Sequence, residues 1–276
     1  MRSLTYLFLF TLSLLSLQRC GGPSEDPFAV AATAEEEHVF SVEDAFRIIA
    51  EENEQTRTLY TSRIVGLGKQ AGIEFHEDWK DEAVEAGPLP ALFLRGTSEE
   101  IRRTDVPLGL YLGSDFPIVQ ANKFQGIQAE KFATIRETKE PEFFYDEENQ
   151  LYTAMFPDFA MAAPCVSCHN DHKNTSKRDW ALGDIMGATT WTYPQDSLTM
   201  DEMLGLVKAY RMGVENTYET FLAEIREFQT KQVPTIGEQW SDSGYAVPDK
   251  ATFMTAVNRE VAPETLERLL SYVKNL

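Results

Sequence analysis

The feature that most constrains this chain is the pentapeptide Cys165-Val166-Ser167-Cys168-His169. Two thiols three positions apart can each bond to one of two neighbouring vinyl groups on the same porphyrin. The histidine that follows the second thiol is then directed at the iron as its proximal ligand. The pentapeptide therefore predicts one covalently bound haem c, attached through Cys165 and Cys168, with His169 on the iron.

Two other chemistries fit parts of the same segment. Cys165, Cys168, His169 and His172 are all residue types that bind zinc, but four ligands within eight residues would be very cramped. A redox-active thiol pair would normally open a helix after a strand, whereas Pro164 and its surroundings predict a loop. Haem attachment is the favoured interpretation, and the zinc and thiol-pair interpretations stay open beside it.

The first 19 residues have the pattern of an export signal. Arg2 supplies a positive charge, and residues 4–17 form an uncharged apolar run that is short for a membrane-spanning helix. Cys20 follows directly, in a layout that resembles the signal of bacterial lipoproteins. We expect residues 1–19 to be a cleaved signal peptide and Cys20 to carry lipid, with residues 20–40 as a tether in the periplasm. A plain secretory signal is the alternative.

The charge of the chain limits its partners. The sequence has 44 acidic and 25 basic residues, and its net charge of −19 becomes about −21 once Arg2 and Arg19 leave with the signal. Such a surface repels nucleic acid and suits a basic protein partner. Cys20, Cys165 and Cys168 are the only cysteines, so each has its own role and none remains for a structural disulfide.

The pattern of apolar and turn residues predicts an α+β fold. Ser41 as a cap, followed by Glu43 and Asp44, predicts a long helix that ends before Gly72. Two further helices are expected at residues 91–102 and 122–137. Strands are expected at residues 108–112, 142–146, 151–156 and 187–193, with the middle two forming a hairpin.

The C-terminal part is predicted to be helical. Residues 200–228 carry an apolar stripe at helical spacing, formed by Met203, Val207, Tyr210, Val214, Phe221, Ile225 and Phe228. The stripe packs either on its own domain, which is the favoured interpretation, or against a second copy as a homodimer seam. Two short helices follow, from Pro248 onward and over residues 263–276. We therefore expect a helical extension over residues 196–276.

The chain resembles a known family, the periplasmic c-type haem domains with a PAS-like fold. Residues 164–172, 176–180 and 182–187 carry the resemblance, which covers about residues 41–195, with weaker matches at 88–91 and 143–145. Members occur alone or fused to chemoreceptors, kinases and nucleotide cyclases. The resemblance implies a long N-terminal helix, an antiparallel sheet that cradles the haem, flanking helices, and a role in sensing or redox chemistry.

The second axial ligand of the iron is the least defined part of the expected site. A methionine would raise the reduction potential, a second histidine would lower it, and an open position would allow gas binding. Met155, Met161 and Met186 lie near the pentapeptide and His76 follows the long helix, so these four residues are the candidates. His172, only three residues past His169, is expected to touch a propionate or solvent instead.

Three residues after the pentapeptide are candidates for contact with the haem. The cations Lys177 and Arg178 could neutralise the anionic propionates, and the Trp180 indole could pack on the macrocycle. An exposed loop is the equal alternative for the cations, and core packing unrelated to haem is the equal alternative for Trp180.

The expected function is electron transfer by an exported, lipid-anchored monohaem c-type cytochrome that meets a redox partner protein. The alternative is a redox or gas sensor, which would signal to a separate partner because no kinase, cyclase or methyl-accepting region follows in the sequence. An enzymatic role such as peroxidase chemistry is the least favoured. It needs an open iron and a distal acid–base residue, and the sequence identifies no such residue.

Overall fold

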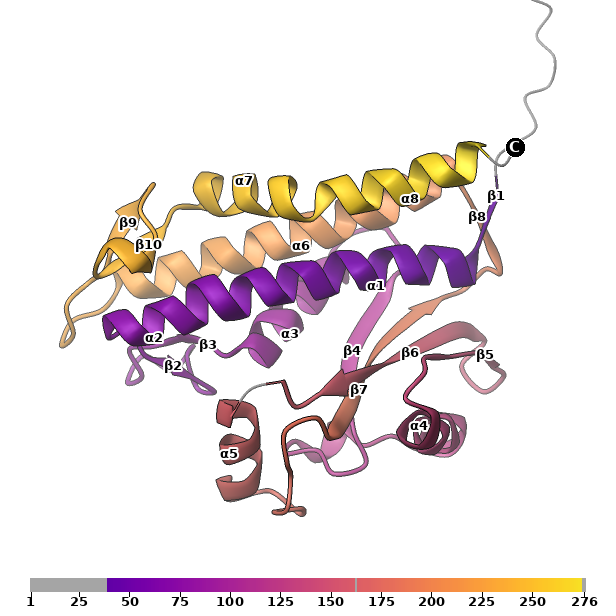
Figure 1. The fold of residues 1–276 in the computed structure, drawn as a ribbon, viewed down its shortest axis with the longest axis horizontal. Coiled ribbons are helices and arrows are strands. Elements are labelled where there is room, and N and C mark those ends of the chain that lie inside the picture. Colours follow the sequence, from indigo (N-terminus) through magenta and orange to yellow (C-terminus); the bar gives the residue numbers. More distant parts are fainter. Residues whose placement is uncertain (1–38, 162, 275–276) are drawn as a thin grey trace, which may run out of the picture. The chain divides into compact units, whose positions relative to one another are not determined.

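The computed structural model describes residues 39–161 and 163–274, so the expected signal peptide and Cys20 lie outside the described residues. The described residues form one compact unit. Within it, a layer of helices lies on one side of a four-stranded sheet, α4 lies on the other side, and α5 lies beyond the ends of two strands (Figure 1). The expected α+β class is confirmed.

The long N-terminal helix is present over its predicted length. Helix α1 (Val42–Leu59) continues into the π-helical segment η1 (Tyr60–Gly66) and then into α2 (Leu67–Ala71). The Ser41 hydroxyl accepts a hydrogen bond from the Asp44 N–H, as expected for an N-cap. Gly72 ends the helix in a left-handed conformation, with φ at 99°. The apolar periodicity of the sequence does not predict the π-helical segment.

The main sheet is antiparallel and has the order β4-β7-β6-β5. Its strands are β4 (Gly109–Gly113), β5 (Glu142–Asp146), β6 (Leu151–Phe159) and β7 (Ile185–Tyr193). All four predicted strands are therefore present, and β5 and β6 form the predicted hairpin. Because the first strand in the chain pairs with the last, β6 and β7 occupy the centre of the sheet.

Side chains of the sheet alternate between its two faces. Ala154 and Trp191 face the helical layer and join the main core. Met155 faces the other side and packs with Phe132 and Ile135 of α4 (Gly126–Thr138). The prediction that this helix starts at residue 122 is wrong. The carbonyl and N–H of Ser114 bond the backbone on either side of Lys123, which keeps Lys123 extended beside the sheet after a 3-10 turn that ends at Asn122.

Helix α6 (Met200–Arg226) confirms the predicted long helix. A capping box of Thr199 and Glu202 starts it. Its apolar stripe packs against this chain, mainly on α3 (Pro90–Ile101), and all of it but the half-buried Phe228 is buried, which confirms packing on its own domain. The boundary expected between residues 195 and 196 thus falls within one continuous hydrophobic core.

The two predicted C-terminal helices are α7 (Lys250–Glu260) and α8 (Ala262–Lys274). Three small pairs of strands complete the unit: β1 (Val39–Ser41) with β8 (Ser197–Thr199), β2 (Phe75–His76) with β3 (Gly87–Pro88), and β9 (Thr235–Gly237) with β10 (Ala246–Pro248). Short 3-10 turns lie at Gln120–Asn122 and Ser241–Ser243. No helix in residues 39–161 or 163–274 has the length and apolarity needed to cross a membrane.

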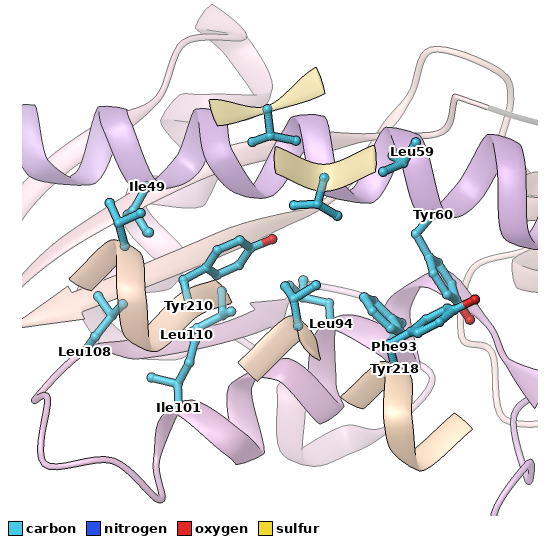
Figure 2. Close-up of a cluster of buried hydrophobic side chains, with 14 of the residues drawn as sticks. Ile49, Leu59, Tyr60, Phe93, Leu94, Ile101, Leu108, Leu110, Tyr210 and Tyr218 are labelled. Atoms are coloured by element: carbon cyan, nitrogen blue, oxygen red, sulfur yellow. The ribbon is translucent and has the colours of Figure 1, made fainter. Parts of the chain in front are cut away.

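The core between the helices and the sheet is rich in aromatic side chains (Figure 2). Tyr60 stacks on Phe93 with ring centroids 3.9 Å apart, and its hydroxyl donates to the Pro88 carbonyl. Tyr218 on α6 stacks on Phe253 of α7 at 4.0 Å and donates to the Pro248 carbonyl. Each buried phenol therefore has a hydrogen-bond acceptor, which offsets the cost of removing it from water.

Candidate haem-attachment site

The pentapeptide lies on helix α5 (Ala163–Asp171), in the connection between the two central strands β6 and β7 (Figure 1). The prediction of a loop is wrong at this point. Pro164 and its surroundings predict a loop, but proline is well tolerated in the first turn of a helix, where its missing N–H has no intrahelical partner. Backbone bonds from Ala160 to Asp184 and from Gly183 to Ala160, 2.8 and 3.0 Å long, close the base of the connection.

The helix brings the three residues of the motif to one side. Cys165, Cys168 and His169 stand at positions i, i+3 and i+4, which share a helix face. Both cysteines are free thiols and both are exposed. The geometry therefore presents two accessible thiols next to the imidazole, as attachment to a single porphyrin requires.

A redox-active thiol pair normally opens a helix after a strand, and α5 does follow strand β6, so the local structure does not argue against that alternative. The electrostatics do disfavour it. Burial raises the pKa of the Cys168 thiol, and the Glu77 carboxylate raises it further. Reactive cysteines have lowered pKa values, because the thiolate is the nucleophile.

His169 is half-buried, and its Nδ1 atom is buried without a hydrogen-bond partner among the described residues. Burial lowers the pKa of this imidazole, while the nearby Asp158 carboxylate opposes that shift. A neutral ring is the form that binds a metal. A buried ring nitrogen without a partner normally costs free energy, so the site fits a group that would engage this imidazole.

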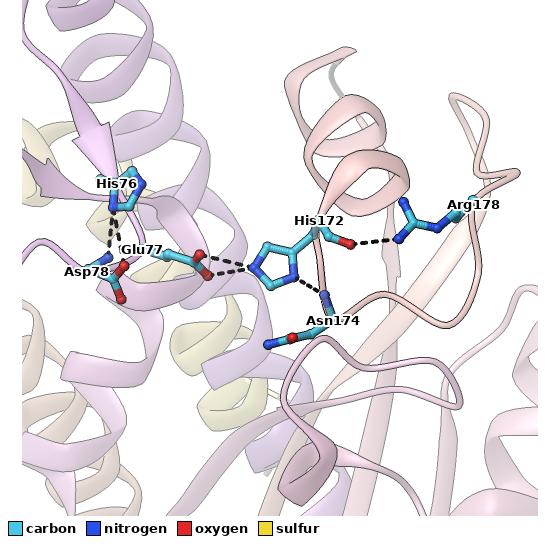
Figure 3. Close-up of polar contacts among 6 residues, drawn as sticks. All are labelled: His76, Glu77, Asp78, His172, Asn174 and Arg178. Atoms are coloured by element: carbon cyan, nitrogen blue, oxygen red, sulfur yellow. Dashed lines mark hydrogen bonds and ion pairs between the residues drawn. The ribbon is translucent and has the colours of Figure 1, made fainter.

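The His172 imidazole is held by Glu77 and Asn174. Its Nε2 atom lies 3.0 and 3.1 Å from the two carboxylate oxygens of Glu77, and its Nδ1 accepts the Asn174 N–H (Figure 3). Both ring nitrogens are thus engaged. Within the residues that the structure describes, no three Cys, His, Asp or Glu side chains converge on a point that could hold a metal ion. The zinc interpretation gains no support.

The basic residues after the motif bind parts of this chain. Arg178 donates to the carbonyls of Asn170 and His172 at the C-terminal end of α5, and Figure 3 shows the second of these bonds. Lys177 pairs with Asp179, and its ammonium lies 4.5 Å from the centre of the Trp180 ring. Trp180 is buried with Phe116 and Met186, and its backbone exchanges two hydrogen bonds with the Asn170 side chain.

The four candidates for the second axial position differ in burial and in their surroundings. Met155 is fully buried on the sheet face that packs on α4. Met186 is buried and packs with Trp180 and with Val166, and Val166 belongs to the motif. Met161 is 80% exposed. His76 lies two residues from Asp78, whose N–H it accepts at Nδ1, on the far side of Glu77 from His172 (Figure 3).

Two residues near the motif have no local signal in the sequence. Asp158, near the end of β6, acts electrostatically on His169 and pairs with Arg57 of α1 at 3.0 Å. Arg57 also donates to the Thr189 hydroxyl of β7. These residues connect α1 to both strands that carry α5. A cleft of about 460 Å³ begins at Glu77 and extends between residues 77–81 and α3.

The fold and the motif together define an α+β domain in which a Cys-x-x-Cys-His helix lies in the connection between β6 and β7, the two central strands of an antiparallel sheet. Residues 35–194 match the model of the Tll0287-like family. This match spans more than half of the chain, which therefore belongs to the Tll0287-like family. No curated protein and no solved structure matches the chain.

Proposed function

We propose that this chain is an exported, lipid-anchored monohaem c-type cytochrome that transfers electrons. One observation carries the proposal: Cys165, Cys168 and His169 share a face of an exposed helix, with both thiols free and one imidazole nitrogen unpartnered. The two thiols would hold the haem covalently and His169 would bind its iron. A bound haem supplies the ability to accept and release one electron.

This chain's own residues support the motif in defined ways. Asn170 and Arg178 fix the C-terminal end of α5, through the Trp180 backbone and the last helix carbonyls. The base of the connection is closed by the Ala160–Asp184 bond. A rigid helix on a closed base holds the two thiols and the imidazole in one relative arrangement, as a pre-organised site requires.

The strand order supports a PAS-like fold as part of the proposal. Counted along the chain, the first of the four strands, β4, pairs with the last, β7. Helix α4 forms the crossover between β4 and β5. This arrangement is compatible with a PAS sheet, with α1 as the long N-terminal helix that the resemblance implies. Export and lipid on Cys20 belong to the same proposal, because haem attachment of this type takes place outside the bacterial cytoplasm.

A redox or gas sensor is the second candidate. Arg57 and Asp158 favour it, because they connect the strands that carry α5 to helix α1, which in turn contacts α6, α7 and α8. A change at the iron would then reach the helical layer. The two candidates differ in the iron: electron transfer predicts a six-coordinate iron that resists carbon monoxide, and sensing predicts exchange of the distal position.

Haem attachment is tested on protein exported from a host that matures c-type cytochromes. Wild type should keep its colour after acid–acetone extraction, and the Cys165→Ala/Cys168→Ala variant should lose it. Cys20→Ser is the matched control: it should release the protein from membranes while the haem remains. Haem that extracts freely from wild type contradicts covalent attachment, and wild type that is already soluble contradicts the lipid anchor.

A further inference from the structure

The imidazole of His169 makes no hydrogen bond to another residue in the described part of the chain, and its Nδ1 atom is buried. A histidine that binds a metal normally engages its second ring nitrogen with a carboxylate or a carbonyl, and that bond sets the orientation of the ring. His169 has no such bond, so the orientation of its ring depends on the chain on either side of it.

The chain on the N-terminal side of His169 is fixed by packing. Val166, three residues earlier on α5, contacts the cluster formed by Ala160, Trp180 and Met186. Ala160 also makes the two backbone hydrogen bonds that close the base of the connection between β6 and β7. This flank of His169 is therefore attached to the packed part of the domain.

The chain on the C-terminal side is fixed by Asn170, which is bound at three points to the segment that returns from α5 to β7. Its side-chain Nδ2 donates to the Trp180 carbonyl at 3.0 Å, and its Oδ1 accepts the Trp180 N–H at 2.9 Å. The Asn170 carbonyl accepts a hydrogen bond of 2.7 Å from the Arg178 guanidinium. Both backbone groups of Trp180 are thus paired with one side chain.

The side chain at position 170 suits this task because of its amide. An amide carries a donor and an acceptor side by side, so it can bond the N–H and the carbonyl of one residue together. An ionised carboxylate has no donor for the carbonyl, and an alanine has neither group. Trp180 is itself buried, so Asn170 fastens the residue next to His169 to a fixed point of the fold.

We propose that Asn170 is a positioning residue for His169. The inference rests on the proposed haem function, because it concerns the ring that would bind the iron. Asn170 holds the peptide unit that joins it to His169, and so restricts the tilt and rotation of the imidazole. The orientation of an axial ligand affects how strongly it binds iron, so Asn170 would act on the reduction potential through His169.

The test compares two asparagines of the same region in the full exported protein. Asn170→Ala removes both bonds to Trp180. Asn174→Ala is the matched control, because the side chain of Asn174 is exposed and makes no hydrogen bond within the described residues, while its backbone N–H still bonds His172. Both variants keep the two thiols, so their content of covalent haem should equal that of wild type.

Electron paramagnetic resonance of the ferric protein and optical redox titration give the readouts. In Asn170→Ala the resonance should broaden and shift, and the midpoint potential should rise, because a loosely held imidazole stabilises the oxidised iron less. Asn174→Ala should match wild type in both. A folded, haem-loaded Asn170→Ala with the spectrum and potential of wild type would overturn the proposal, as would equal shifts in the two variants.

Urea unfolding verifies that each variant is folded. If Asn170→Ala does not fold, Asn170→Gln takes its place, since it keeps the amide on a longer stem, and it should show the same changes to a smaller degree. Spectra and potential equal to those of wild type in that variant would also contradict the positioning role.

A second arm does not depend on haem. In the Cys165→Ala/Cys168→Ala background, Asn170→Ala should make hydrogen exchange at residues 165–172 about tenfold faster or more, and Asn174→Ala should leave it unchanged. Wild type without covalent haem contradicts the proposed function but leaves this arm readable. Unchanged exchange in Asn170→Ala contradicts the positioning role even where haem is attached, so the two failures are distinguishable.

Discussion

Asp158 lies where β6 leads into the connection that carries α5, and its carboxylate meets the Arg57 guanidinium of α1 at 3.0 Å. The same carboxylate acts on His169, and Arg57 also bonds Thr189. Both partners are largely shielded from solvent, so their charges are screened less than those of a surface pair. At this scale, one ion pair places two opposite charges beside the proposed iron ligand.

These charges should act on the proposed haem with opposite signs. Asp158→Asn removes a negative charge that stabilises the oxidised iron, so the midpoint potential should rise. Arg57→Gln removes a positive charge and leaves Asp158 unpaired, so the potential should fall. Redox titration with optical detection measures both. Arg63→Gln, on the same helix but paired with Glu260, should leave the potential unchanged. Shifts of the same sign in both variants would show that the pair acts only on structure.

Among the elements, α3 and α6 make an unusually close crossing. A Cβ atom at Gly213 of α6 would lie 2.8 Å from the Thr97 carbonyl oxygen of α3. A Cβ atom at Gly96 of α3 would lie 2.6 Å from a methyl of Thr217. The two backbones approach each other because both positions lack a side chain, and this approach lets the stripe of α6 reach the core.

The crossing provides a matched pair of substitutions on one helix. Gly213→Ala should destabilise the protein by about 1–3 kcal/mol, because the backbone oxygen it meets cannot move aside easily. Gly205→Ala, where a Cβ would meet no atom within 4 Å, should stabilise it by up to about 1 kcal/mol through helix propensity. Urea unfolding measures both. Equal effects at the two positions would contradict the close crossing.

A second connection between elements depends on pH. The Glu85 carboxylate, just before β3, accepts the backbone N–H groups of Gln229, Thr230 and Lys231 after α6. These hydrogen bonds, with that of Thr230 the largest contributor, lower the pKa of Glu85 to about 2. Because the folded-state pKa is lowered, the stabilisation is present above the ordinary value of 4.5 and is lost as the pH falls toward 2.

Glu85→Gln should therefore destabilise the protein at pH 7 and have a smaller effect near pH 3. Urea midpoints at both pH values measure this difference, and hydrogen exchange at residues 229–231 should become faster in the variant at pH 7. Glu82→Gln removes an exposed carboxylate from the same segment and serves as the control. An equal loss of stability at both pH values would assign the effect to packing.

At the scale of the whole unit, a buried polar network joins its first and last helices. Glu52 of α1 is fully buried, and its carboxylate accepts hydrogen bonds from Arg211 of α6 and from the Thr265 hydroxyl of α8. Asn53 next to it accepts the Tyr210 hydroxyl. The C-terminal helices therefore complete a network that begins on α1, and they share its core rather than forming a separate layer.

Removing one partner of this network should be costly. Arg211→Met leaves Glu52 as a buried charge without its cation, and we expect a loss of about 3–5 kcal/mol in the free energy of unfolding. The double variant Glu52→Gln/Arg211→Met should recover part of that loss. Arg226→Met, which breaks an exposed pair with Glu219, should cost less than about 1 kcal/mol. Full additivity in the double variant would mean that the two groups do not interact.

Local spacing in the sequence was enough to locate the Cys-x-x-Cys-His motif, the N-terminal helix, the four strands and the stripe of α6, because each depends on residues a few positions apart. The helical state of the motif was missed because proline alone does not distinguish a loop from a first helical turn. Only tertiary packing brings Arg57 to Asp158, 101 positions away, and Glu77 to His172, 95 positions away. Such contacts are decided by how distant elements pack, and no periodicity along the chain records them.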